Sequence, residues 1–260
     1  MRSGTHWTTS GSCWRTGPMA PAGYGGRVEG IHAVAAASSA GRVRRLWVEE
    51  GRLRRREVKD IADLIPPERV SVVPDARAVA ETEEPQGLVA DCVPILPLPI
   101  DDLATDDAAV IVLDHVEDPH NVGAIARSAL AAGMTGMLIS SRRAAPLSAV
   151  AFKAASGALE RLPVTVVGSI PDALSRLKTS GLWVVGLDAG GDTSLFGLDL
   201  LTEPVAVVVG SEGQGLSVLA TKRCDLVVSV PMSAGTESLN ASVSAALAAF
   251  EIMRARRSPS

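Results

Sequence analysis

The stretch PVAVVVGSEGQGLS, residues 204–217, decides the fold of this chain. It begins with an almost unbroken run of valines, which is typical of a β-strand buried on both faces of a sheet. Gly210, Gly213 and Gly215 follow, and they predict a loop whose backbone lets another group approach closely. In parallel α/β sheets the ligand site lies beyond the carboxyl ends of the strands, so we expect this loop to be part of a site.

Five further apolar runs of the same kind lie before and after this strand, at 109–116, 136–141, 162–167, 182–188 and 224–232. Helical patterns separate or follow them, at 121–133, 148–162, 170–181 and from Leu239 onward. The last helix carries an apolar stripe at Leu239, Val243, Ala246, Phe250 and Met253. Buried strands that alternate with helices predict an α/β domain at 108–257, with a mostly parallel sheet covered on both faces.

The first half of the chain predicts a smaller α/β domain, residues 27–93. Its helical and strand patterns alternate, with helices at 30–40 and 56–65 and strands at 44–50 and 69–74. A segment rich in Pro and Asp, 94–107, has no periodicity and is interpreted as a linker. Residues 1–26 have no apolar run. We interpret them as a disordered tail and not as a signal peptide, with translation from Met19 as a hypothesis.

The overall composition is that of an ordinary soluble protein. The 260 residues are 47% hydrophobic and 21% charged, and the net charge of −4 excludes a protein that coats nucleic acid by bulk charge. Cys13, Cys92 and Cys224 are odd in number and far apart, without a C-x-x-C pattern or a neighbouring His. They predict neither a disulfide framework nor a zinc site, so we expect no metal, no membrane partner and a reducing cytoplasm.

One segment is locally basic. RVRRLWVEEGRLRRREVK, residues 42–59, contains eight Lys or Arg against three Glu. Such a segment is either a solvated surface or a binding surface for nucleic acid, and the charge pattern alone does not choose between them.

Polar residues stand in two loops that follow predicted strands. Asn121 occupies the expected N-cap of the helix after residues 109–116, and Arg127 lies on its second turn, from which it can lean back toward the loop. The glycines of the second loop have the order G-x-x-G-x-G, not the G-x-G-x-x-G of dinucleotide sites, and no Lys-Ser/Thr pair of a phosphate-binding loop follows. Glu212 repels a pyrophosphate but suits a neutral or cationic ligand.

The third loop, VPMSAGTESLN at 230–240, leads into the last helix. Ser238 and Asn240 stand at its mouth, where helix capping alone explains one polar residue. Capping alone does not explain polar residues in all three loops, so we interpret the three loops as one site.

The ordered set N-x-G-x-x-x-R, G-S-E-G-x-G and V-P-M-x-x-G-x-x-S-L-N is similar to the three motifs of the SpoU family, also called TrmH, of RNA ribose 2'-O-methyltransferases. The segment from Arg27 to about Val93, with EGIHAV and PQGLVADC, resembles the N-terminal RNA-binding domain of the RlmB-type members. The departures are Val230, where Ile is more usual, and Ala241, where Val commonly follows the Asn.

The resemblance implies a SPOUT-type domain with a C-terminal deep trefoil knot and a site completed across a homodimer. It implies S-adenosylmethionine as methyl donor, with the donor-binding residues Gly210, Gly215, Val230, Met232 and Leu239. Arg127 is expected to grip the target phosphate and polarise the 2'-hydroxyl. The residues expected to orient Arg127 and the ribose are Asn121, Glu212, Ser238 and Asn240.

The same resemblance favours RNA as the partner of the basic segment, through Arg52, Arg54 and Arg55. We expect 2'-O-methylation of a ribose in structured RNA, with a guanosine of large-subunit 23S rRNA as the leading substrate. Methylation of tRNA, or of an rRNA site that confers antibiotic resistance, stays open. Two other classes compete with a methyltransferase: a nucleotide-dependent α/β enzyme, and a non-catalytic RNA-binding protein of the same fold.

Overall fold

The computed structural model describes residues 23–142, 144–233 and 238–257. The predicted tail up to residue 22, the hypothetical start at Met19 and part of the third loop lie outside the described residues. Residues 23–26, which we included in the tail, pair with the linker, because the backbone N–H and C=O of Tyr24 both bond to Ile95, at 2.9 and 2.8 Å.

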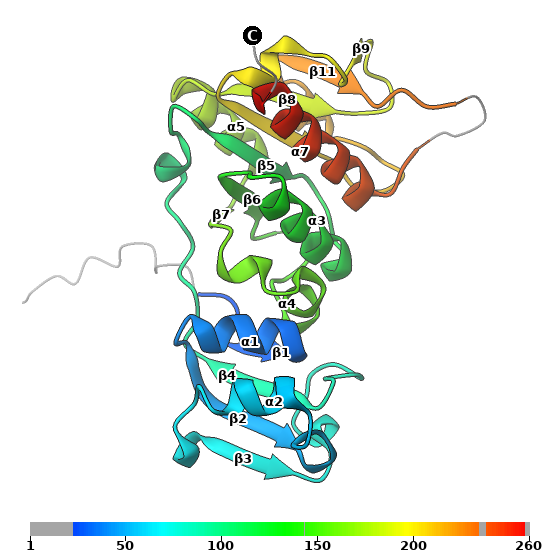
Figure 1. Cartoon of the computed structure of the whole chain (residues 1–260). Coiled ribbons are helices and arrows are strands. Elements are labelled where there is room, and N and C mark those ends of the chain that lie inside the picture. The colour runs from blue at the N-terminus through cyan, green and yellow to red at the C-terminus, as the bar shows by residue number, and fades with distance from the viewer. Residues whose placement is uncertain (1–22, 143, 234–237, 258–260) are drawn as a thin grey trace, which may run out of the picture.

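The N-terminal domain is a four-stranded sheet with two helices on one face (Figure 1). The strands lie in the order β1 (Arg27–Glu29), β4 (Leu88–Cys92), β2 (Val43–Glu49) and β3 (Val70–Val73). Helices α1 (Ile31–Ser39) and α2 (Arg56–Ala62) bury their apolar side chains against it. The two predicted helices and two predicted strands are confirmed, whereas β1 and β4 were not predicted.

The C-terminal domain contains a seven-stranded sheet in which every neighbouring pair is parallel. The strands lie in the order β7 (Val164–Val167), β6 (Gly136–Ser140), β5 (Ala109–Leu113), β10 (Val205–Val209), β8 (Trp183–Leu187), β11 (Leu226–Ser229) and β9 (Thr193–Ser194). β10, the valine run that opened the sequence analysis, is buried throughout and lies between β5 and β8. The predicted parallel sheet is confirmed.

Helices cover both faces of this sheet. Alternate residues of β5 and β10 enter two separate cores, as a sheet buried on both sides requires. One core contains α3 (Pro119–Ala131), α4 (Ala149–Ala155) and α7 (Ala241–Arg257), and the other contains α5 (Ile170–Thr179) and α6 (Val218–Thr221). Figure 1 shows α7 and α3 side by side on the same face.

Short 3₁₀ helices fill the connections: η1 (Glu50–Arg52), η2 (Pro67–Arg69), η3 (Ala76–Ala78), η4 (Ile100–Leu103), η5 (Ala158–Glu160) and η6 (Asp199–Thr202). η4 lies within the predicted linker, and its Ile100 and Leu103 are buried in the second core. The linker is therefore packed against the C-terminal domain, because its few apolar residues add to that core.

The single helix predicted at 148–162 is wrong. α4 ends at Ala155, Ser156 and Gly157 adopt left-handed φ values of 49° and 88°, and η5 follows. At Gly157 a Cβ would lie 2.8 Å from the Cβ of Ala36 in α1. The chain therefore turns here at a residue without a side chain, which lets α1 pack closely.

The two domains share a continuous apolar core and a buried ion pair. Arg42 of the N-terminal domain donates from Nε to Glu160 of the C-terminal domain at 2.7 Å, and its NH2 group contacts the other carboxylate oxygen. The side chains of the pair are 12% and 3% exposed. Burial is also the main reason that the pKa of the nearby Tyr24 is raised to about 12. These contacts fix the N-terminal domain relative to the parallel sheet.

Candidate active site

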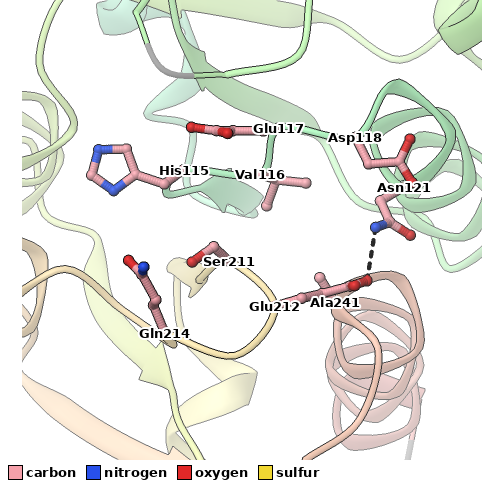
Figure 2. A pocket seen from close by; sticks show the side chains of 9 residues that line it. All are labelled: His115, Val116, Glu117, Asp118, Asn121, Ser211, Glu212, Gln214 and Ala241. Atoms are coloured by element: carbon pink, nitrogen blue, oxygen red, sulfur yellow. Dashed lines mark hydrogen bonds between the residues drawn. The ribbon is translucent and has the colours of Figure 1, made fainter.

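Three loops that follow the carboxyl ends of β5, β10 and β11 meet at one edge of the parallel sheet. Nδ2 of Asn121 donates to Oε1 of Glu212 at 2.8 Å, although the two residues are 91 positions apart (Figure 2). Nδ2 of Asn240 donates to Oδ1 of Asn121 at 3.1 Å and also to Oε1 of Glu212. We call these three residues the amide–carboxylate network. One residue from each predicted motif is therefore part of a single hydrogen-bonded cluster.

Asn121 is free for this role because it does not cap its helix. α3 begins two residues earlier, at Pro119, and the carboxylate of Asp118 accepts the N–H of His120 at 2.9 Å as the N-cap. The expected N-cap position of Asn121 is wrong, since proline is well suited to the first position of a helix. At the other end of the network Asn240 does cap α7, because its Oδ1 accepts the N–H of Ser242 at 2.8 Å.

The first cavity opens beside this network and has a volume of about 450 Å³. We call it the acceptor cavity; its lining residues come from the loops after β5 and β10 and from the start of α7: His115, Val116, Glu117, Asp118, Asn121, Ser211, Glu212, Gln214 and Ala241. Figure 2 shows these side chains around the opening, with the network at one end and His115 and Gln214 at the other. The lining is polar and offers both hydrogen-bond donors and acceptors.

A second cavity of about 380 Å³, the donor cavity, adjoins the first. Its lining contains all five residues expected to bind the donor, namely Gly210, Gly215, Val230, Met232 and Leu239. Ser238, which we grouped with Asn121 and Glu212, lines this cavity and not the acceptor cavity. Ser211, Gln214 and Ala241 line both cavities, so the two share a wall.

Two glycines shape the loop between the cavities. A Cβ on Gly210 would lie 2.2 Å from the backbone of Gly215, where the loop closes through a pair of 3.1 Å hydrogen bonds between Ser211 and Gly215. Gly215 itself has a φ of 65°, and a Cβ there would lie 2.4 Å from Oδ2 of Asp188. Both positions exclude a side chain, which explains the glycine spacing of the second loop.

Arg127 lies elsewhere. It is exposed on α3, its NH1 group donates to Oγ of Ser156 at 3.3 Å, and it lines neither cavity. Six residues separate Arg127 from Asn121, so they point to different sides of the helix. Within one chain, the expectation that Arg127 reaches back toward the loop of Asn121 is not met, because its guanidinium bonds instead to Ser156, which directly follows α4.

An apolar groove runs between α3 and α7. Its lining residues are Ala124, Ser128, Ser242, Val243, Ala246, Leu247 and Phe250. Val243 and Phe250 are 46% and 43% exposed, although both belong to the predicted apolar stripe. The side of α7 that packs on the protein is formed by other residues: Ala241, Ala245, Ala248, Ala249, Glu251 and Ile252.

Two family models match this chain. The model of the SpoU rRNA methylase family matches residues 108–250, and a model for RNA 2'-O ribose methyltransferase substrate binding matches residues 27–97. The chain belongs to the SpoU rRNA methylase family. The motif resemblance is thereby confirmed at the level of the family.

Relatives of this SpoU-family chain carry the same kind of name. A protein named tRNA/rRNA methyltransferase from Mycobacterium ulcerans is 50% identical over 155 residues, which are 60% of this chain and 50% of the relative. One from Synechocystis is 47% identical over 147 residues, or 56% of this chain and 38% of the relative. The matches thus span about half, or less, of the length of these relatives.

Solved SpoU structures have the same two-domain fold. The SpoU methyltransferase AviRb from Streptomyces viridochromogenes, in complex with the cofactor AdoMet, aligns with a TM-score of 0.75 at 27% identity, over 90% of this chain and 91% of that one. A TrmH-family RNA methyltransferase from Porphyromonas gingivalis aligns with a TM-score of 0.72 at 27% identity, over 88% and 89%.

The three arginines expected to bind RNA in this SpoU-family chain differ in how exposed they are. Arg54 and Arg55 are exposed before α2. Arg52 is half-buried, its Nε lies 3.8 Å from a Glu49 carboxylate oxygen, and its side chain packs over Gly87. Arg54 and Arg55 are therefore more available to a polyanion than Arg52.

The sequence analysis missed Asp114, His115, Ser211 and Gln214. Asp114 and His115 directly follow β5, and Ser211 and Gln214 lie in the glycine loop. The feature that could have identified them in the sequence is their position, because each lies just beyond the carboxyl end of a buried strand, where ligand sites form.

Within the described ranges, no group of three or more His, Cys, Asp or Glu side chains is arranged to hold a metal ion. No helix in the described part of the chain is both long and apolar enough to cross a membrane.

Proposed function

We propose that this SpoU-family chain transfers a methyl group from S-adenosylmethionine to a ribose 2'-hydroxyl in structured RNA. The observation that carries the proposal is the pair of adjoining cavities that share Ser211, Gln214 and Ala241. A group transfer needs donor and acceptor held side by side with the reacting atoms in contact. The complex of the similar protein AviRb with AdoMet supports the choice of donor.

The donor cavity fits the chemistry of S-adenosylmethionine. Its wall combines the bare backbone of Gly210 and Gly215 with the apolar side chains of Val230 and Leu239, which suits a flat base and an aliphatic chain. Asp188 adds a carboxylate, and the described residues of its wall include no Lys or Arg, as expected for a cationic ligand without phosphate. When bound there, S-adenosylmethionine supplies an electrophilic methyl group on a sulfonium.

The acceptor cavity receives the target ribose in this proposal. Asn121 and Asn240 hold the Glu212 carboxylate in place, and the network in turn orients the ribose hydroxyls. Ser238, which lines the donor cavity, positions the donor side of the site. Arg127 binds the target phosphate and polarises the 2'-hydroxyl, because its planar guanidinium matches a phosphate in bidentate geometry.

Arg127 performs this role in the site of a second copy of the chain. The guanidinium lies outside both cavities of its own chain, and the α3–α7 groove carries the exposed side chains of Val243 and Phe250. A homodimer that buries this groove removes the exposed Phe250 and Val243 from water and brings Arg127 toward the partner. The trefoil knot implied by the family resemblance belongs to the same proposal for the C-terminal domain.

Ribosomal RNA is the proposed substrate, with a guanosine of 23S rRNA as the leading target. The N-terminal domain, matched by the substrate-binding model, supplies a second RNA contact through Arg54, Arg55 and, more weakly, Arg52. The buried Arg42–Glu160 pair keeps this contact at a fixed distance from the cavities, which favours a large folded RNA. We place the reaction in the cytoplasm, in keeping with the free thiols of Cys92 and Cys224.

The test is transfer of tritiated methyl from S-adenosylmethionine to unmodified 23S rRNA and, separately, to a pool of unmodified tRNA. Label in 23S rRNA that maps to one 2'-O-methyl guanosine supports the full proposal. Label only in tRNA retains the reaction and replaces the substrate. RNA binding without any label supports a non-catalytic RNA-binding protein, and binding of a nicotinamide cofactor in place of S-adenosylmethionine supports a nucleotide-dependent enzyme.

A further inference from the structure

The acceptor cavity contains an imidazole that the functions assigned so far do not use. His115 directly follows the buried Asp114 at the end of β5 and lines this cavity. Its Nδ1 lies 3.5 Å from Oδ1 of Asp114, whose carboxylate is 1% exposed. The other oxygen of Asp114 accepts the backbone N–H of Ser217 at 2.7 Å. Asp114 is thus fixed in place beside the imidazole, which lines the cavity.

His115 lies at the same end of the acceptor cavity as Gln214. Figure 2 shows its ring toward the same end of the view as Gln214, with Ser211 between that end and the network. Gln214 and Ser211 also line the donor cavity. The imidazole therefore lies near one part of the wall that the two cavities share, and Ala241 belongs to the other part of that wall.

The reaction releases a proton, and the other polar groups near the cavity are poor acceptors for it. The guanidinium of Arg127 stays protonated in proteins. Glu212 binds the amides of Asn121 and Asn240, and Asp118 caps α3. Glu117 is the remaining carboxylate of the lining, and a carboxylate is a weaker base than an imidazole near neutral pH.

We propose that His115 is the proton acceptor of the methyl transfer, positioned by Asp114; this inference rests on the proposed methyltransferase function. The imidazole of His115 takes the 2'-hydroxyl proton as the oxygen forms its bond to the methyl carbon of the sulfonium donor. The electron pair of the broken carbon–sulfur bond goes to sulfur. The products are a 2'-O-methyl ribose, a neutral thioether and an imidazolium that the Asp114 carboxylate stabilises.

The first test is the pH dependence of single-turnover methyl transfer to whichever RNA the wild type methylates. The wild-type rate is expected to fall as the pH is lowered, as for a reaction that needs an unprotonated base. His115→Asn keeps the left-handed φ of 59°, which Asn tolerates, but accepts no proton. We expect it to lower the rate at pH 7 on the order of a hundredfold and to abolish the pH dependence, with unchanged S-adenosylmethionine binding by calorimetry.

Three variants make this outcome specific. His115→Gly also fits a positive φ and is expected to match His115→Asn, which separates proton transfer from misfolding. His120→Asn removes an exposed imidazole five residues away that lines neither cavity, and it is expected to behave as wild type. Glu117→Gln is expected to retain the pH dependence. A His115→Asn rate within twofold of wild type, or loss of the pH dependence in Glu117→Gln instead, overturns the proposal.

A second readout does not depend on turnover. In an NMR spectrum of the full chain with labelled histidine, the signal missing from His115→Asn identifies His115. Ribonucleoside 5'-monophosphates at millimolar concentration are expected to shift this signal and not that of His120; an unmoved His115 signal contradicts contact with the acceptor. If the wild type transfers no methyl to any RNA, the proposed function fails, whereas methyl transfer that is indifferent to His115 removes only this inference.

Discussion

Helix α3 carries residues of the proposed site on two of its sides, and these sides differ in how many contacts they make within the chain. On one side Asn121 is 9% exposed and is bonded to Glu212 and Asn240 from loops far along the chain. On the other side Arg127 is exposed, with one 3.3 Å hydrogen bond to Ser156, and an uncovered apolar groove lies between α3 and α7. Both residues belong to the first motif, yet a single chain completes only the side of Asn121.

This difference indicates which side of α3 finds its partners within the chain and which side depends on a second molecule. The amide–carboxylate network finds its hydrogen bonds within the chain, so its geometry is independent of assembly. Arg127 has neither a phosphate nor a carboxylate to bind in its own chain among the described contacts, and the exposed Phe250 lies along the same groove. We therefore expect variants on the Arg127 side to act through dimer formation and catalysis, and to leave the fold of the monomer unchanged.

The largest expected effect is that of Phe250→Asp. A carboxylate placed in a buried dimer interface costs several kcal/mol, so we expect the variant to sediment as a monomer at micromolar concentration and to lose methyl transfer. Because Phe250 is 43% exposed in the monomer, the thermal stability of the single chain should change by only about 0.5 kcal/mol.

The matched control is Val218→Asp, which puts the same charge on an apolar side chain that is 70% exposed on α6, away from the groove. It is expected to remain dimeric and active. Sedimentation of the wild type as a monomer at micromolar concentration is the result that removes the homodimer and, with it, the proposed position of Arg127.

Arg127→Ala comes next. We expect the single-turnover rate to fall on the order of a hundredfold or more while S-adenosylmethionine still binds, because the guanidinium acts on the transition state and not on the donor. Arg127→Lys should fail nearly as badly, since an ammonium lacks the planar fork. Arg223→Ala, a change at an exposed arginine outside both cavities, is the control. Near-normal turnover in Arg127→Ala contradicts the catalytic role, and loss of donor binding moves Arg127 to the donor cavity.

Mixing two inactive variants tests the two sides of α3 directly. If Arg127 serves the partner's site, a dimer of one Arg127→Ala chain and one Asn121→Ala chain has one intact site and one doubly defective site. Random pairing makes half of the dimers mixed, so about one quarter of the wild-type rate should return. If both residues serve the same chain's site, no mixed dimer has an intact site and no activity returns.

The parallel sheet and the meeting of the three loops could be predicted from sequence for a simple reason. Strands buried on both faces read as runs of Val and Ile, as in β10, and parallel strands place their carboxyl ends at one edge. Local pattern therefore decides which loops meet. It does not decide which side of a helix another element covers, and this is where the expectation for Arg127 on α3 failed.

α7 illustrates this limit of a hydrophobic pattern. Its sequence stripe of Val243 and Phe250 stands out because these side chains are large, yet the buried side of the helix is mostly alanine, including Ala245 and Ala248. Small residues allow α7 to pack close to α3 and the sheet, and alanine gives little contrast in a hydrophobic pattern. Asp114 and His115 were missed for a related reason, since only the folded chain shows that a buried carboxylate stands behind an imidazole.

The smallest expected effect lies outside both sides of α3, in the basic segment. Replacing Arg52, Arg54 and Arg55 together with Ala should weaken RNA binding about tenfold at moderate salt and lower the slope of log affinity against log salt by about 2. Arg52 should contribute least, because it is already close to Glu49. Donor binding and the maximal rate at saturating RNA should stay as in the wild type.

The control removes three exposed positive charges from the C-terminal domain, Arg161, Lys222 and Arg223, and should leave the salt slope unchanged. If the first variant binds RNA as tightly as the wild type, the basic segment is a solvated surface and the N-terminal domain binds RNA through another face.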